Sequence, residues 1–113
     1  GHLTEMCAAS NTTAELTFDS VPILNKEAID YYLDEGAVPG GTKRNWASYG
    51  HKIGELSDYQ MNILADPQTS GGLLMAVSEA EHKAFEDFIS SSSYQATKIG
   101  RMKSKGDKLV QIV

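Results

Sequence analysis

The sequence is poor in the residues that mark secreted, membrane-spanning and metal-binding proteins. Cys7 is the only cysteine, so no disulfide can form within the chain, and this fits a reducing, cytoplasmic compartment. No apolar run approaches the roughly 18 residues that a membrane-spanning helix requires, and we predict no membrane partner. The three histidines stand far apart, and with one cysteine they make no recognisable zinc spacing. We therefore predict no metal site within these residues.

Basic residues are also scarce. The net charge is −5, whereas a nucleic-acid-binding protein usually carries a basic stripe, because phosphate contacts supply most of its affinity. The only basic cluster lies between Lys98 and Lys108, and we interpret it as a solvated turn. The sequence therefore predicts no nucleic-acid partner.

What the chain does contain is typical of one small folded domain. It has 113 residues, of which 41% are hydrophobic and 22% charged, close to the average of globular proteins. Cys7 falls in an apolar stripe with Leu3 and Met6 at helical spacing. We therefore expect Cys7 to be a small core residue, because a reactive thiol would need a cationic or helix-N-terminal setting.

Local signals divide the chain into helices and strands. Asn25 can cap a helix that Gly36 ends, Ser57 and Gln60 fit a capping box, and Asp66-Pro67 stops the helix that follows. The predicted helices cover residues 2–10, 26–35, 58–64 and 79–90, and the predicted strands cover 14–18, 72–77, 95–102 and 108–113. This order predicts an α+β fold, a mixed β-sheet covered by helices.

The first segment that can carry chemistry belongs to a long predicted loop over residues 36–56, with a helical turn at 44–49. A loop of this length in a small domain is often functional. Its candidate site residues are Gly40, Gly41, Thr42, Arg44 and Asn45. The Arg44 guanidinium can make a bidentate contact to phosphate or carboxylate. The alternative interpretation is a mobile surface turn with a solvated Lys-Arg pair.

The second segment joins the predicted helix 58–64 to the predicted strand 72–77. Its glycines permit a left-handed backbone and a close approach to a ligand, so the turn can form an anion-binding nest. The P-loop spacing is absent. The alternative is a tight turn that feeds a buried strand. The candidate site residues here are Asp66, Gln68, Thr69, Ser70, Gly71 and Gly72.

No catalytic group emerges from spacing alone. Asp30, Asp34 and Glu35 lie at the end of one predicted helix and look like surface charge rather than a catalytic carboxylate pair. Trp46 and Tyr49 flank the first segment, and we expect them to anchor it by burial rather than to stack on a ligand. We therefore assign no catalytic residue to this chain.

Several segments are similar to those of one enzyme family. Asp66-Pro67-Gln68-Thr69-Ser70-Gly71-Gly72-Leu73-Leu74 resembles, without a break, the long signature of selenophosphate synthetases (selenide, water dikinases). Val38–Thr42 with Arg44-Asn45, and Gly1-His2-Leu3 with Glu5-Met6, resemble two further family segments, and Ile99-Gly100 resembles the closing strand region. The segments occur in family order and span the whole chain.

The resemblance implies a fold, an activity and partners. The family converts selenide, ATP and water to selenophosphate, AMP and phosphate, using magnesium. Its fold would be that of the aminoimidazole ribonucleotide synthetase superfamily, in which an N-terminal ATP-binding domain dimerises and a C-terminal α+β domain closes over it. Residues 1–113 resemble that C-terminal domain without its first elements. The expected partners are the protein's own ATP-binding domain and, in the parent homodimer, ATP and selenide.

The same resemblance limits what this chain can do. In the family the reactive cysteine or selenocysteine, its lysine and most metal-binding aspartates lie far upstream, and a last metal-binding aspartate precedes the Gly-His-Leu segment. Cys7 does not match the reactive cysteine. We therefore expect an enzyme fragment that is inactive alone and binds no ATP or magnesium by itself. The two glycine-bearing segments would line the interdomain side of the active site.

Two alternatives come from other classes of protein. The chain could belong to another ATP-dependent synthetase or kinase of the superfamily, such as a hydrogenase-maturation or thiamine-phosphate kinase relative, although the unbroken Asp66–Leu74 match argues against this. It could also be a stand-alone binding module that never had an ATP-binding domain.

Overall fold

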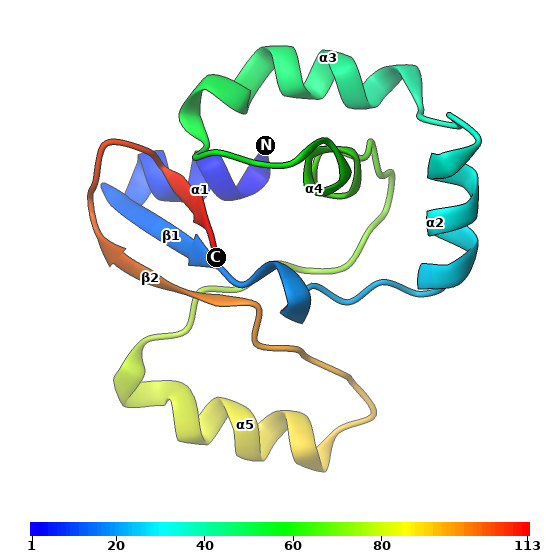
Figure 1. Cartoon of the computed structure of the whole chain (residues 1–113). Coiled ribbons are helices and arrows are strands. Elements are labelled where there is room, and N and C mark those ends of the chain that lie inside the picture. The colour runs from blue at the N-terminus through cyan, green and yellow to red at the C-terminus, as the bar shows by residue number, and fades with distance from the viewer.

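A small mixed sheet forms the centre of the computed structural model, which describes all 113 residues (Figure 1). Its three strands are β1 (Thr12–Leu16), β2 (Gly100–Ser104) and β3 (Val110–Ile112), in the order β2-β1-β3. β1 pairs antiparallel with β2 and parallel with β3. Together with five helices, this sheet confirms the predicted α+β class.

The helices differ in how closely they approach the sheet. They are α1 (His2–Ser10), α2 (Lys26–Asp34), α3 (Gly40–Tyr49), α4 (Asp58–Leu64) and α5 (His82–Ser91), with 3-10 turns at Phe18–Ser20, Gly50–Lys52 and Glu79–Glu81. α1 packs against β1 and β3. Figure 1 shows α3 and α4 on the same side of the molecule as α1. Helix α5 lies apart from the other helices, and two long connections join it to the rest of the chain.

Helix ends follow the local signals closely. The Ala28 N–H donates to the Asn25 Oδ1 atom at 3.0 Å and caps α2. Gly36 follows α2 with a φ of 75°, which is left-handed and suits glycine. Ser57 and Gln60 form the complete capping box that starts α4. These three predictions are confirmed because each depends only on residues a few positions apart.

The core is small. Its fully packed members are Cys7, Ala14, Leu16 and Val110, surrounded by half-buried side chains such as Leu3 and others from the sheet and α4. Cys7 is therefore a core residue, as its place in the apolar stripe predicts. Only 9 of the 113 residues are buried, so much apolar surface that a domain of this size normally hides is still exposed.

The prediction of a long loop over residues 36–56 is wrong where α3 forms, and the helical turn predicted at 44–49 is the second half of that helix. Residues Gly40–Tyr49 form α3, a regular helix of ten residues. Glycine is a poor helix former, costing about 1 kcal/mol relative to alanine, but here packing overrides propensity. A β-carbon at Gly50 would lie 2.6 Å from the Trp46 ring, so the glycine lets the indole fold over the end of the helix. Trp46 is half-buried, as expected for an anchor.

The predicted strand 72–77 does not form, and the strand predicted over 95–102 begins only at Gly100. Both edges of β1 are occupied by β2 and β3, and residues 72–77 pair with no strand. The strand predicted over 14–18 covers Thr12–Leu16 instead, because Phe18 starts a 3-10 turn. α5 begins at His82 rather than 79, after another such turn.

Two helix faces are less buried than their apolar spacing predicts. On α2, Ile29 and Leu33 are half-buried, but Tyr32 is exposed and meets Tyr31 edge to face. On α5, Phe85 and Ile89 are half-buried and Phe88 is exposed. In each case the sequence identifies an amphipathic helix correctly, but the helix has little opposite it to pack against.

Candidate functional site

The two glycine-bearing segments meet where α3 begins and α4 ends. A β-carbon at Gly41 would lie 2.7 Å from the Pro67 Cγ atom and 2.9 Å from its Cβ atom. Real β-carbons do not approach other atoms this closely, so only glycine lets the first turn of α3 pack against the Asp66-Pro67 corner. The segments are far apart in the sequence, and this contact brings them together in space.

A hydrogen bond fixes the same junction one turn further along α3. The Asn45 Nδ2 atom donates to the Ala65 carbonyl oxygen at 3.0 Å. Ala65 is almost fully buried at the C-terminal end of α4, and Asn45 is half-buried. The bond therefore satisfies a carbonyl that the end of α4 leaves without an intrahelical partner.

The start of α3 has backbone donors without partners. The helix has no side-chain cap, and the backbone N–H groups of Gly40 and Gly41 have no hydrogen-bond partner in the chain. The Arg44 side chain folds back over this turn, since its Nη1 atom lies 3.8 Å from where a Gly40 β-carbon would be. Free N–H groups, the positive end of the helix dipole and a guanidinium form a setting that suits an anion.

Thr42 does not face solvent. Its side chain is fully buried, and its Oγ1 atom has no hydrogen-bond partner within the protein. A buried hydroxyl without a partner is uncommon and costs stability, because its interactions with water are lost without replacement. Thr42 therefore belongs to the packed interior of the junction between α3 and its neighbours.

The second segment turns in a different way from the one predicted. The left-handed residue is Ser70, with a φ of 58°, and neither Gly71 nor Gly72 has a positive φ. The expectation that these glycines supply the left-handed backbone is wrong. The bare α-carbon of Gly71 instead leaves room for Gln68, whose Oε1 atom lies 3.1 Å from where a β-carbon would be. The Gln68 Nε2 atom donates in turn to the Asp66 Oδ2 atom at 3.4 Å.

The structure thus unites part of the predicted site and separates the rest. Gly41 and Asn45 touch the corner at Ala65 and Pro67, with Gly40 and Arg44 beside it. The hydroxyl and glycine residues Thr69–Gly72 are exposed and form no hydrogen bond with that corner. Pro67 belongs to the family signature in the sequence, but neither Ala65 nor Pro67 was predicted as a site residue.

Other charged groups lie away from this junction. The Arg101 Nε atom donates to the Glu15 Oε1 atom at 2.7 Å, and the Lys103 Nζ atom donates to the Glu15 Oε2 atom at 2.8 Å. These bonds, first Lys103 and then Arg101, lower the pKa of Glu15. The cluster borders an open hollow of about 310 Å³ on the strand face. It joins β1 to β2, so a structural role accounts for it.

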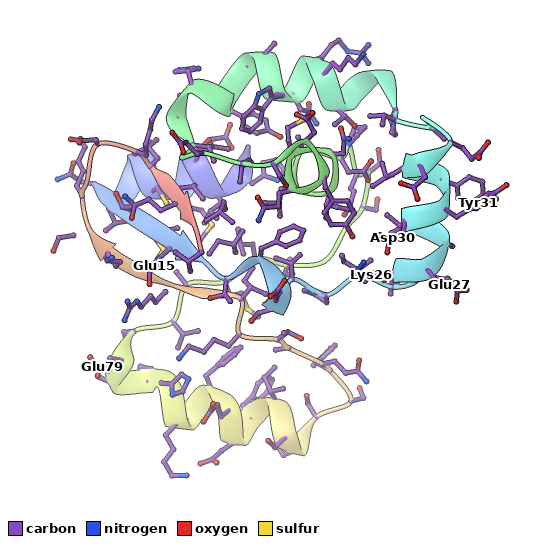
Figure 2. The ribbon with its side chains drawn as sticks, viewed as in Figure 1. Glu15, Lys26, Glu27, Asp30, Tyr31 and Glu79 are labelled. Atoms are coloured by element: carbon purple, nitrogen blue, oxygen red, sulfur yellow. The ribbon has the colours of Figure 1, made fainter.

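A second charged cluster joins α2 to α4. Figure 2 shows Lys26 and Asp30 on the inner side of α2, with Glu27 and Tyr31 pointing outward. Lys26 forms an ion pair with Asp30, whose other carboxylate oxygen accepts a hydrogen bond of 2.7 Å from the Tyr59 hydroxyl. The lysine and then the tyrosine lower the pKa of Asp30. These contacts attach α2 to α4 and form no catalytic pair.

The chain offers no ready metal site. No three histidine, cysteine, aspartate or glutamate side chains gather closely enough to hold an ion. None of the helices has the length and the run of apolar residues that a membrane crossing requires.

Comparison with known families identifies the domain. A model of the AIR synthase related protein, C-terminal domain, matches residues 1–112. The chain belongs to this family. Proteins that resemble the chain over nearly its whole length include the "Selenide, water dikinase" of Pasteurella multocida, 44% identical over 93% of the chain. The protein of that name from Aeromonas hydrophila is 42% identical over 100% of the chain.

A higher identity appears over a shorter stretch. The "Selenide, water dikinase" of a Shewanella species is 61% identical over 80 residues, or 71% of the chain. The resemblance to selenophosphate synthetases predicted from the Asp66–Leu74 segment is therefore confirmed for this AIR synthase related domain. The chain spans 29% of the Pasteurella protein and 32% of the Aeromonas protein, about a third of the length of these relatives.

Proposed function

We propose that this chain is the C-terminal part of an enzyme that makes selenophosphate from selenide, ATP and water, with AMP and phosphate as the other products. The observation that carries the proposal is the similarity over essentially the whole chain to proteins named selenide, water dikinase. The family domain and the mixed sheet agree with it. The rest of the enzyme, including an ATP-binding domain, lies outside these residues.

The junction of α3 with the Asp66-Pro67 corner is the part of this chain that faces the active site. Gly40 and Gly41 supply free backbone N–H groups, and Arg44 lies over them. Preorganised donors of this kind stabilise charge that develops on phosphate oxygens, at no cost of reorganisation during the reaction. Their role in this proposal is to hold a phosphate group and to exclude water when the two domains close.

Magnesium and ATP bind elsewhere in the parent. No three histidine, cysteine, aspartate or glutamate side chains of this chain gather at one point, and we assign the magnesium ligands to the other domain, as the family resemblance implies. The reactive groups for phosphoryl transfer therefore come from the other domain. This chain helps to hold the phosphate group and to exclude water from the active site, so we propose that it is inactive alone.

The partners follow from the same arrangement. We propose that the chain packs on its own N-terminal ATP-binding domain, that the parent is a homodimer through that domain, and that it works in the cytoplasm. The unpaired, buried Cys7 thiol supports a reducing compartment.

The test is whether ATP cleavage depends on selenide. The full-length parent, incubated with ATP, magnesium and selenide, should release AMP only when selenide is present. The 113-residue chain is the matched control and should release none. AMP or ADP released at the same rate without selenide would contradict the assignment of substrate.

A further inference from the structure

An open hollow lies on the outer side of α2, where Figure 2 shows Glu27 and Tyr31 pointing away from the rest of the molecule. Its volume is about 350 Å³, and it is lined by Asn25, Glu27, Ala28, Tyr31 and Tyr32. Glu27 and Tyr31 are one helical turn apart, and so are Ala28 and Tyr32, so the two pairs lie side by side on the helix surface. The hollow has room for roughly ten water molecules at about 30 Å³ each, far more than a single ion needs.

Two tyrosine rings border this hollow. Tyr31 and Tyr32 meet edge to face, with ring centroids 5.3 Å apart and ring planes at 73°. Tyr31 is 61% exposed and Tyr32 is 59% exposed, so much of each ring is open to solvent. The face of an aromatic ring carries partial negative charge and attracts a cation that lies over it.

Glu27 adds a full negative charge beside these rings. Its carboxylate forms no ion pair within the protein. No lysine or arginine occurs between Lys26 and Lys43, and Lys26 lies with Asp30 on the inner side of α2 (Figure 2). The chain itself therefore supplies no cation to the outer hollow.

The inner side of the same helix shows what such a combination holds. There the Lys26 Nζ atom lies 5.3 Å from the centre of the Tyr59 ring and pairs with the Asp30 carboxylate. A carboxylate and a tyrosine ring thus hold a cationic side chain between them on one side of α2. On the outer side Glu27 supplies the carboxylate, the two bordering tyrosines supply the rings, and no cationic side chain of this chain reaches them.

We propose that the outer hollow of α2 binds the guanidinium group of an arginine side chain that a partner protein carries. Arginine suits the hollow better than lysine, because its planar guanidinium can lie flat on a tyrosine ring and still direct paired N–H groups at the Glu27 carboxylate. An ammonium group is a compact charge that cannot make both contacts in this way.

A protein partner suits the hollow better than a free small molecule. Small-molecule sites bury about 70–90% of their ligand, whereas this hollow is open along one side of a helix. A partner protein covers the surface around the hollow as well. Leu24 belongs to that surface, since it precedes the lining residue Asn25 and is 105% exposed.

Peptide binding to the full-length parent tests the proposal. The probe is the blocked peptide Ala-Arg-Ala-Arg-Ala, and in the control peptide citrulline, which has nearly the same shape without the charge, replaces both arginines. We expect the arginine peptide to shift the NMR signals of Tyr31 and Tyr32 saturably, a lysine peptide to bind more weakly, and the citrulline peptide to shift nothing.

Three results would overturn the proposal. Equal binding of the arginine and lysine peptides would rule out a guanidinium site. Free arginine amide that binds as tightly as the peptide would rule out a protein partner. Shifts in the 113-residue chain but none in the parent would show that the parent itself covers this side of α2.

Two matched pairs of variants locate the binding. Glu27→Gln and Tyr31→Leu should each weaken binding of the arginine peptide by about two- to fivefold, the effect of one exposed ion pair or cation–π contact. Glu79→Gln removes the same charge at an exposed residue well apart from α2 (Figure 2). Tyr94→Leu removes a ring that is 68% exposed elsewhere. Both controls should leave the dissociation constant unchanged.

All four substitutions fall on exposed side chains, so each variant should fold. If Glu27→Gln and Glu79→Gln weaken binding equally, the peptide responds only to net charge, and the proposal is wrong. The same conclusion follows if Tyr31→Leu and Tyr94→Leu have equal effects.

Discussion

Gly41 and Pro67 pack so closely that a β-carbon on the glycine would lie 2.7 Å from the proline Cγ atom. Position 41 lies in the first turn of α3, and position 67 lies just after α4, so this contact joins the two glycine-bearing segments. It is a steric requirement that neither segment reveals by itself.

The first prediction concerns this contact. Gly41→Ala should lower the free energy of unfolding of the 113-residue chain by about 1–3 kcal/mol, because extra atoms in a packed contact force neighbours to move. Urea unfolding measures the change. Gly40→Ala is the matched control, since its β-carbon would meet nothing closer than 3.8 Å. It should leave stability unchanged or raise it, given the better helix propensity of alanine. Equal effects of the two variants would contradict the account of the junction.

The second prediction concerns the bond between Asn45 and the Ala65 carbonyl. Asn45→Ala should lower the free energy of unfolding by about 1 kcal/mol, because it removes a part-buried hydrogen bond and leaves the carbonyl unpaired. Asn45→Asp should cost more, since it places a carboxylate beside a carbonyl oxygen. Ser48→Ala, on the exposed face of α3, removes only a bond to the carbonyl of its own helix and serves as the control. If all three variants unfold at the same urea concentration, the bond does not hold α3 to α4.

The third prediction is a dependence of stability on pH. Lys103 and Arg101 hold the pKa of Glu15 below its ordinary value of 4.5. A carboxyl with a lower pKa in the folded state adds stability above the unfolded pKa and loses that contribution as the pH falls through the folded pKa. The urea midpoint should therefore fall as the pH drops from about 6 to about 3, and less steeply in Glu15→Gln. Glu55→Gln, at an exposed residue without an ion pair, should leave the dependence of the urea midpoint on pH the same as in the unsubstituted chain. If the urea midpoint of Glu15→Gln falls with pH as steeply as that of the unsubstituted chain, Glu15 does not contribute this pH-dependent stability.

The fourth prediction separates the site from the fold. Arg44→Ala in the full-length parent should reduce turnover at least about tenfold, the loss expected when one charge-stabilising contact of roughly 1.4 kcal/mol is removed. Its melting temperature should stay the same, because Arg44 is exposed and its guanidinium forms no ion pair or hydrogen bond in the chain. Lys43→Ala, at the neighbouring exposed residue, is the control. Full turnover in Arg44→Ala would remove Arg44 from the site.

The fifth prediction concerns the second segment. Gly71→Val in the parent should reduce turnover without unfolding the enzyme, because the added side chain would displace Gln68, which bonds to Asp66 at the corner. Gly71 has no left-handed φ, so valine is not excluded by the backbone, and its nearest neighbour is the flexible Gln68 side chain. Turnover and circular dichroism of the same preparation measure the two effects. A variant that folds and turns over normally would show that this segment does not face the reacting groups.

The sequence predicts the features that depend on near neighbours. The Asn25 cap, the Ser57–Gln60 capping box and the burial of Cys7 each follow from a pattern of a few residues. The family resemblance also depends on short contiguous segments. Both kinds of prediction are confirmed. The caps need no distant partner, whereas the burial of Cys7 also needs the strands β1 and β3 to pack on α1.

Features that depend on distant partners were not predictable. The glycines at the start of α3 indicate a loop until Pro67 is known to pack on Gly41. Residues 72–77 have the composition of a strand, but a strand forms only by pairing with another strand, and no pattern in the run reveals that these residues pair with none of the three strands. The two candidate segments were predictable one by one, whereas their meeting at the Asp66-Pro67 corner was not.

Phosphorus NMR of the full-length parent with ATP, magnesium and selenide tests the central claim most directly, with the 113-residue chain as the control. The account predicts selenophosphate, AMP and phosphate from the parent and none of them from the short chain. ADP as the only nucleotide product, or products that form equally well without selenide, would contradict it and assign the parent to another ATP-dependent activity.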